Sequence, residues 1–284
     1  QRRRGAEERP LSSLFSPLSF LLSPLSFKPY LCRMAALPCI RSFNQTELAA
    51  FIADMGEPAY RARQIYAWLW KKGALSIDEM TDLPLALREK LKAAVTMEAL
   101  SVDMEQKSSD GTIKVRFLTH DGHRIEGVMI PADDRMTACV SSQVGCNLAC
   151  TFCATGFIKV KRNLEPWEIV DQVVLLNRAA MKYHGRGLTN IVYMGMGEPL
   201  LNYKNVLASV ERITAEDGLF MSPKRITVST AGIAKMIRKL ADDAVRFNLA
   251  LSLHAADDIK RSKLMPINDA NNLNDLVMAL NYFY

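Results

Sequence analysis

The sequence predicts a protein of the α/β class with a smaller helical region ahead of the main domain. Its composition, 49% hydrophobic and 23% charged over 284 residues, is that of an ordinary globular protein. Apolar residues have helical spacing up to about residue 102, and strand and helix patterns alternate after about residue 136. Such β-α-β alternation predicts a parallel sheet whose ligands gather at the carboxyl ends of the strands. No stretch approaches the roughly 18 apolar residues of a membrane span, so we expect no membrane association.

Residues 1–33 form a low-complexity extension. The sequence Ser-Pro-Leu-Ser-Phe occurs twice, and Pro17 and Pro24 would interrupt a helix there. The chain begins with Gln, so we interpret this segment as a disordered or non-native extension ahead of a natural start at Met34. Because the segment carries most of the formal net charge of +6, total charge does not indicate a polyanionic partner.

Residues 34–105 are predicted to form a small helical accessory domain. Asn44 and Glu47 have the spacing of a capping box, a second helix runs to Gly73, and a third follows Pro84. The basic side chains of this region either contact phosphates or form a solvated surface: Arg61, Arg63, Lys71 and Lys72.

Residues 106–135 are predicted to form a β meander leading into the core. Between about residues 110 and 143 the apolar period changes to two, and Asp110-Gly111 and Asp121-Gly122 are typical turns between strands.

Residues 136–284 are predicted to form the main domain. Strands are expected at 137–142, 190–194, 225–229 and 247–251, and helices at 164–183, 203–215 and 233–241. Each motif described next follows one of those strands.

The first motif is a group of three cysteines, Cys146, Cys150 and Cys153, with gaps of three and two residues. Three thiolates supply one ligand fewer than a cysteine-ligated [4Fe-4S] cluster needs, which leaves one iron open to the amino and carboxylate groups of S-adenosylmethionine. The alternatives are a zinc site completed by His184 or His254, and simple buried thiols. The uneven distribution of the cysteines argues against a disulfide framework and favours a reducing, cytoplasmic compartment.

Polar and glycine-rich segments follow the later strands. Gly197 permits close backbone approach to a ligand, and Glu198 offers an acceptor suited to an ammonium group. The next two strands end in residues that could meet a ribose or an adenine: Ser229, and then Ser252, Leu253 and His254. Each of these segments taken alone is typical of an ordinary loop.

Together the motifs resemble the RlmN-type radical-SAM adenine methyltransferases. The resemblance rests on the three cysteines with Phe152 before the last, on Cys139 to Gly145, and on Gly195-Met196-Gly197-Glu198-Pro199. It extends through Ser229-Thr230, Ser252-Leu253-His254 and Pro266-Ile267-Asn268, and it covers the chain from about residue 43 to its end.

The resemblance implies a radical-SAM partial (β/α)6 barrel, of which about four βα units are expected here. It implies methylation of C2 of adenine in 23S rRNA and in tRNA anticodon loops through a methylcysteine, with a [4Fe-4S] cluster and two S-adenosylmethionine molecules per turnover. An electron donor such as flavodoxin and a monomeric state are expected with it.

Individual residues match functional positions of the family. Glu126 matches the proton acceptor and Cys139 the resolving cysteine, whereas Gly197, Glu198, Ser229 and Ser252 to His254 match S-adenosylmethionine contacts. If the strand face that Glu126 shares with Val128 and Ile130 is buried, desolvation would raise its pKa toward that of a useful base. A surface glutamate and a buried small hydrophobic residue are the alternatives for Glu126 and Cys139.

The sequence departs from the family because no cysteine follows Cys153, so the methyl-carrying cysteine is missing. We therefore expect a truncated chain that binds a cluster without methylating RNA. Three other functions stay open: a related C8-directed rRNA adenine methyltransferase, a radical-SAM enzyme with another substrate, and a non-catalytic, metal-stabilised RNA-binding module.

Overall fold

The computed structural model describes residues Leu37–Tyr284. The extension predicted over residues 1–33 lies outside this range. In the described part of the chain, no helix combines the length and the apolar character needed to cross a bilayer.

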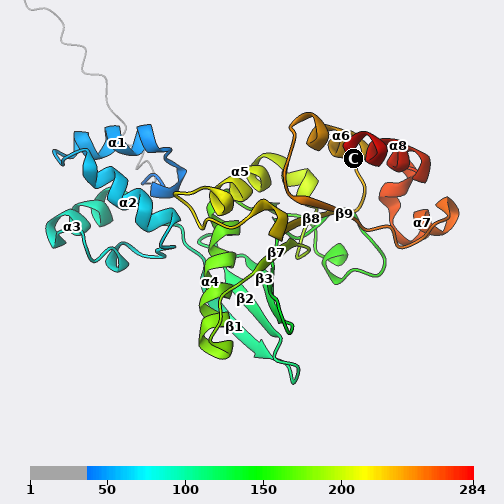
Figure 1. Cartoon of the computed structure of the whole chain (residues 1–284), viewed down its shortest axis with the longest axis horizontal. Helices are drawn as coiled ribbons and strands as arrows, with labels where there is room; N and C mark the ends of the chain where they lie inside the picture. The colour runs from blue at the N-terminus through cyan, green and yellow to red at the C-terminus, as the bar shows by residue number, and fades with distance from the viewer. Residues whose placement is uncertain (1–36) are drawn as a thin grey trace, which may run out of the picture. The chain divides into compact units, whose positions relative to one another are not determined.

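Three helices form the first part of the structure, blue to cyan in Figure 1: α1 Gln45–Asp54, α2 Tyr60–Trp70 and α3 Leu85–Ala94. The capping box predicted at Asn44 is present, because its side chain accepts from the Glu47 N–H and the Glu47 carboxylate accepts from the Asn44 N–H. Buried apolar side chains from all three helices, including Leu48, Ile65 and Leu87, belong to the hydrophobic core. One 3-10 helix, Ile40–Ser42, precedes α1, and another, Ile77–Glu79, lies between α2 and α3.

A seven-stranded sheet has the order β1-β2-β3-β4-β7-β8-β9. Its first four strands are antiparallel neighbours: β1 Ser101–Lys107, β2 Ile113–Leu118, β3 Arg124–Pro131 and β4 Met136–Cys139. The meander was predicted over residues 106–135, with the period-two pattern from about residue 110, yet β1 begins at Ser101. All seven side chains of β1 are exposed, so no buried alternating face marks the strand in the sequence.

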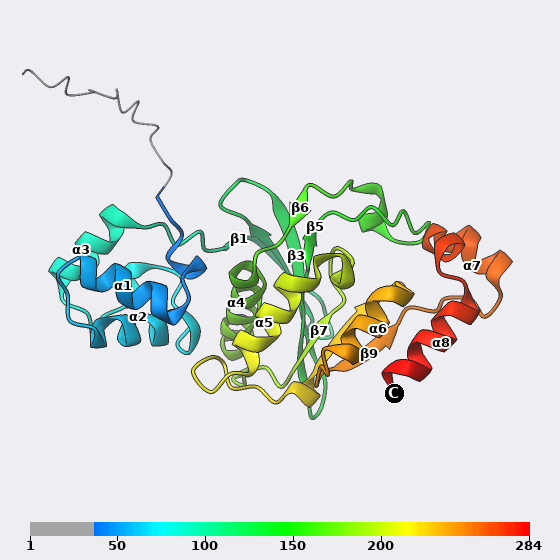
Figure 2. The same ribbon diagram turned by 90° about the horizontal axis from the view of Figure 1, so that it is seen from above.

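From β4 onward the strands are parallel neighbours: β7 Asn190–Tyr193, β8 Ile226–Thr230 and β9 Asn248–Leu251. Helices connect them or follow them: α4 Pro166–His184, α5 Tyr203–Thr214, α6 Ala234–Asp242, α7 Asp258–Leu264 and α8 Leu273–Phe283. Figure 2 shows α4, α5 and α6 in turn along one face of the sheet. This is the predicted α/β class with four strands of a parallel, unclosed barrel.

The two faces of the sheet differ in burial. On β3, Ile125, Gly127 and Met129 are buried, and a Cβ on Gly127 would lie 3.2 Å from Leu176 of α4. Glu126, Val128 and Ile130 alternate with them and point to the opposite, partly exposed face. The chain between β4 and α4 forms a small second sheet, β5 Gln143–Val144 with β6 Arg162–Asn163, around the cysteine segment.

Candidate functional site

A cavity of about 260 Å³ lies where the parallel strands end. Its walls come from the cysteine segment and from the residues after β7, β8 and β9. Eight of the residues predicted from the sequence line it: Cys146, Cys150, Cys153, Gly197, Glu198, Ser229, Ser252 and His254. Segments separated by more than a hundred residues thus meet at one site.

Backbone contacts hold the cysteine segment in place. The Cys146 N–H donates to the Ile158 carbonyl at 2.9 Å, and the Val160 N–H donates to Oδ1 of Asn147 at the same distance. The Thr151 N–H donates to the carbonyl of Leu264 at the end of α7, also at 2.9 Å. The loop is therefore tied both to its own return strand and to the last part of the described chain.

The three thiols are partly buried and close enough to influence one another. Burial raises the pKa of Cys146 and of Cys150. The charge of Cys153 adds to the increase at both residues, and that of Cys146 adds to it at Cys150. Three thiolates at this place would repel one another unless a cationic group lay among them, so their chemistry fits a shared iron-sulfur cluster.

The two histidines considered for a zinc site lie in different places. His184 does not line the cavity; its ring contacts the Gly111 carbonyl at 3.1 Å. His254 does line it.

The loop after β7 places Glu198 in the cavity wall. This carboxylate is 3% exposed, and it accepts from the Leu200 N–H at 3.1 Å and from the Ala231 N–H at 2.8 Å. Burial raises the pKa of Glu198, and the two N–H donors oppose that increase. Because Ala231 follows β8, Glu198 also joins the ends of two neighbouring strands.

The serines and the histidine predicted at the later strand ends meet across the cavity. The Ser229 and Ser252 hydroxyl oxygens are 3.3 Å apart. The His254 ring lies with its centroid 4.1 Å from that of Phe152 in the cysteine segment. Leu253, in contrast, is 41% exposed and does not line the cavity.

Glu126 and Cys139 do not line this cavity. Cys139 ends β4 between Val128 and Val192 on the neighbouring strands, and burial raises the pKa of its thiol to about 11. The sequence predicted that Glu126 would become a useful base if its face of the strand were buried. That face is not buried: the Glu126 side chain is 43% exposed and pairs with Nζ of Lys114 at 2.8 Å. The alternating pattern showed which side chains share its face but not which face α4 covers.

Sequence reasoning missed several residues that shape the cavity. Tyr193, Met194 and Met265 line it, and Gln143 accepts from the Glu198 N–H at 2.9 Å through Oε1. An apolar residue at a strand end looks the same whether it faces a core or a cavity. Only the polar Gln143, placed directly before the cysteine segment, carried a signal that could have been used.

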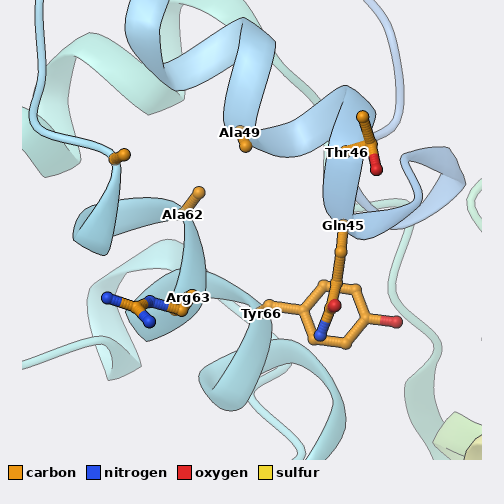
Figure 3. Close-up of a pocket in the computed structure, with 7 residues that line it drawn as sticks. Gln45, Thr46, Ala49, Ala62, Arg63 and Tyr66 are labelled. Carbon is orange, nitrogen blue, oxygen red and sulfur yellow. The ribbon is translucent and has the colours of Figure 1, made fainter.

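A second cavity, of about 370 Å³, lies between α1 and α2. Figure 3 shows Arg63 and Tyr66 of α2 facing this space together with Gln45 of α1. Of the basic residues predicted on this surface, Arg63 is exposed, whereas Lys72 lies over the Trp68 ring and pairs with Asp82. The cavity holds no cluster of titratable groups comparable to that of the cysteine site.

Comparisons with known proteins agree with the division seen in the structure. Residues 40–97 match the family model of the N-terminal domain of ribosomal RNA large subunit methyltransferases, and residues 140–283 match that of the radical SAM superfamily. A radical SAM methyltransferase from Sphaerobacter thermophilus superposes with a TM-score of 0.81 at 42% identity. That match covers 87% of this chain and 72% of the other.

Two curated relatives indicate which kind of methyltransferase the chain resembles. A probable dual-specificity RNA methyltransferase RlmN of Cytophaga hutchinsonii is 57% identical over 245 residues, 86% of this chain and 67% of that protein. A dual-specificity RNA methyltransferase RlmN of Anaeromyxobacter dehalogenans is 46% identical, over 87% of this chain and 67% of that protein.

The open parallel barrel and the cysteine-lined cavity define the chain as an enzyme of the radical SAM superfamily. The helical N-terminal part matches the N-terminal domain of ribosomal RNA large subunit methyltransferases, which identifies a family within that superfamily. The chain belongs to the RlmN family of dual-specificity RNA methyltransferases.

Proposed function

We propose that the reaction of this protein is methylation of C2 of adenine in 23S rRNA and in tRNA anticodon loops through a methylcysteine intermediate. The 284 residues hold no cysteine after Cys153 to carry that methyl group, so this chain by itself should bind the cluster without completing the transfer. The observation that carries the proposal is the cavity at the strand ends, lined by three thiols, Glu198, Ser229 and Ser252. A carbon at this position of adenine is not nucleophilic, so a polar methyl transfer would fail and radical chemistry is needed.

In this proposal Cys146, Cys150 and Cys153 hold a [4Fe-4S] cluster, and one iron remains for S-adenosylmethionine. When bound, the cluster supplies the electron that cleaves the carbon-sulfur bond of S-adenosylmethionine. A donor such as flavodoxin would provide that electron. Glu198 and Gly197 would receive the methionyl group, and Ser229, Ser252 and His254 the nucleoside, whereas Leu253 does not line the cavity.

Glu126 is proposed to take the proton from C2 of the adenine. Its partial exposure leaves it accessible to an RNA, and its ion pair with Lys114 fixes the carboxylate on the open face of the sheet. The Cys139 thiol is proposed to attack the sulfur of the methyl-carrying cysteine, so that the disulfide forms as the bond from that sulfur to the RNA-linked carbon breaks and the RNA is released. Since burial raises its pKa to about 11, this thiol holds its proton at neutral pH and must lose it as the disulfide forms.

The cluster and its cofactor can be tested directly on this chain. Anaerobic reconstitution should give about four irons per chain. With S-adenosylmethionine and a reductant, the reconstituted protein should release 5′-deoxyadenosine, and the Cys150→Ala variant should not. A wild-type chain that folds but takes up zinc in preference to iron would reject the proposed chemistry and favour a metal-stabilised RNA-binding module.

The position of methylation needs a separate measurement. Mass spectrometry of 23S rRNA and tRNA from the source organism should show 2-methyladenosine that disappears when the gene is deleted. Loss of 8-methyladenosine instead would assign the protein to the C8-directed enzymes.

A further inference from the structure

Arg261 on α7 is the one arginine of the described chain whose exposed fraction is 0%. A charged side chain is almost never fully buried unless a partner of opposite charge accompanies it. Arg261 therefore requires an explanation that the predicted site residues do not supply.

The guanidinium donates to three separate segments. Nη2 donates to the Ala231 carbonyl at 2.5 Å, Nε to the Leu253 carbonyl at 3.2 Å, and Nη1 to Oδ1 of Asn268 at 2.6 Å. Ala231 follows β8 and lines the cysteine cavity, and Leu253 lies between two residues that line it. Asn268 belongs to the 3-10 helix Pro266–Ala270, which begins directly after the cavity residue Met265.

The third acceptor is itself held in position. Nδ2 of Asn268 donates to Oδ1 of Asp258 at 2.9 Å and to the Ser262 hydroxyl at 3.0 Å. These bonds orient the amide so that its oxygen faces Arg261. The side chain that accepts from Nη1 of Arg261 is therefore itself fixed by hydrogen bonds.

All three acceptors are neutral oxygens. Within residues 37–284 Arg261 forms no ion pair with a carboxylate. Burial lowers its pKa, whereas the charges of Asp258 and then Cys150 raise it. A positive charge without an ion-pair partner thus lies against Ala231, which lines the cysteine cavity, and against Leu253, whose two neighbours line it.

We infer that Arg261 is a positioning residue of the cysteine cavity, which joins the ends of β8 and β9 to the 3-10 helix Pro266–Ala270 and supplies the buried positive charge that favours an anionic cluster there. The inference rests on the proposed function for the identity of that cluster. Its physical basis is the low local dielectric, which strengthens the interaction of a buried cation with thiolates.

Two substitutions separate the tether from the charge. Arg261→Gln removes the charge, and Arg261→Lys retains it but cannot reach all three acceptors with one ammonium group. Lys260→Gln is the matched control because it removes one positive charge from the exposed side of the same helix.

The tether can be measured without any cofactor. Amide hydrogen exchange at residues 231–232 and 253–255 should be faster in both Arg261 variants than in the wild type and unchanged in Lys260→Gln. In the reconstituted proteins, both variants should bind S-adenosylmethionine about tenfold more weakly, since the strand ends are less well fixed.

The charge is measured by the reduction potential of the cluster, followed by EPR during a redox titration. We expect a more negative potential in Arg261→Gln and a near wild-type potential in Arg261→Lys and Lys260→Gln, because net charge around a cluster tunes its potential. A folded Arg261→Gln protein that fails to retain iron while Arg261→Lys retains it would also support the inference.

Wild-type exchange rates and wild-type affinity for S-adenosylmethionine in Arg261→Lys would overturn the tether, even if Arg261→Gln does not fold. Equal potentials in Arg261→Gln, Arg261→Lys and the wild type would overturn the role of the charge. Failure of the wild-type chain itself to bind a cluster would instead reject the proposed function, so the two failures are distinguishable.

Discussion

At the scale of single residues, Gly197 shows how closely the loop after β7 packs onto the strand that precedes the cysteines. Its φ is +98°, and a Cβ there would lie 2.6 Å from Cβ of Gln143 and 2.8 Å from its backbone nitrogen. Only glycine combines that backbone conformation with this approach. The neighbouring Glu198 reaches Ala231 from the backbone position so fixed.

Gly197→Ala should therefore reduce the free energy of unfolding by about 2–4 kcal/mol, from backbone strain together with overpacking. Urea denaturation measures the change. Gly122→Ala is the matched control, since its φ of +83° is similar but nothing lies within 4 Å of its Cβ position. That variant should lose about 1 kcal/mol from strain alone. Equal losses in the two variants would show that contact with Gln143 is unimportant.

At the scale of elements, the cysteine segment is clamped where it ends. Arg162 of β6 donates through Nε and Nη2 to the two carboxylate oxygens of Asp121, at 2.6 and 2.8 Å. It also donates through Nη1 and Nη2 to Glu168 of α4, at 2.6 and 2.8 Å. One guanidinium thus fixes the end of the cysteine segment to a turn of the meander and to a buried helix start.

Asp121→Asn should destabilise the protein in a pH-dependent way. Arg162 lowers the pKa of the Asp121 carboxyl well below its usual range, so this group stabilises the fold above the unfolded pKa of about 3.9. We expect a loss of about 1–2 kcal/mol at pH 7, limited by partial exposure. The difference from wild type should shrink as the pH falls below about 4, because Asp121 of the unfolded chain then takes up a proton while the folded carboxylate stays ionised.

Urea denaturation between pH 7 and pH 3.5 measures this difference. Asp134→Asn removes a carboxylate that is 82% exposed, and it should change stability little at any of these pH values. A gap between Asp121→Asn and wild type that stayed constant across the series would contradict the role of the ionised carboxylate.

The elements also show what the sequence could predict. Helix α5 was expected at 203–215 and is Tyr203–Thr214, because its apolar spacing and its position after Asn202 are local signals. The contacts of Arg162 could not be predicted, since Asp121 lies 41 residues away along the chain. The cysteines and Glu198 could be predicted because they belong to local sequence motifs. Arg261 could not, because its contacts are distant along the chain and the sequence around it is that of any basic residue of an amphipathic helix.

At the scale of the whole molecule, a buried ion pair joins the first helical part to helix α4. Arg41, in the 3-10 helix Ile40–Ser42, pairs with Asp171 of α4, and both side chains are almost completely buried. Nη2 of Arg41 donates to the Ala74 carbonyl at 2.5 Å, and the Leu100 N–H donates to Oδ2 of Asp171 at 2.9 Å. Four segments from different parts of the chain therefore meet at one pair of charges.

Removing one partner should be more harmful than removing both charges. Arg41→Met leaves the Asp171 carboxylate buried without a counter-charge, and the free energy of unfolding should fall by about 3–5 kcal/mol at pH 7. The double variant Arg41→Met, Asp171→Asn removes the charge and keeps an acceptor for the Leu100 N–H, so it should recover more than half of that loss.

The same pair predicts the dependence on pH. Burial already raises the pKa of Asp171, and Arg41 opposes that increase, so loss of Arg41 should raise the pKa further. A carboxyl with a raised folded pKa stabilises the protein below its unfolded pKa, and this contribution is lost as the pH rises through the folded value. The defect of Arg41→Met should therefore be largest at pH 7 and smaller at pH 5, as measured by urea denaturation. Arg135→Met, which removes an exposed guanidinium, serves as the control. A defect of Arg41→Met that grew toward acid pH would mean that the Arg41–Asp171 pair does not couple these segments.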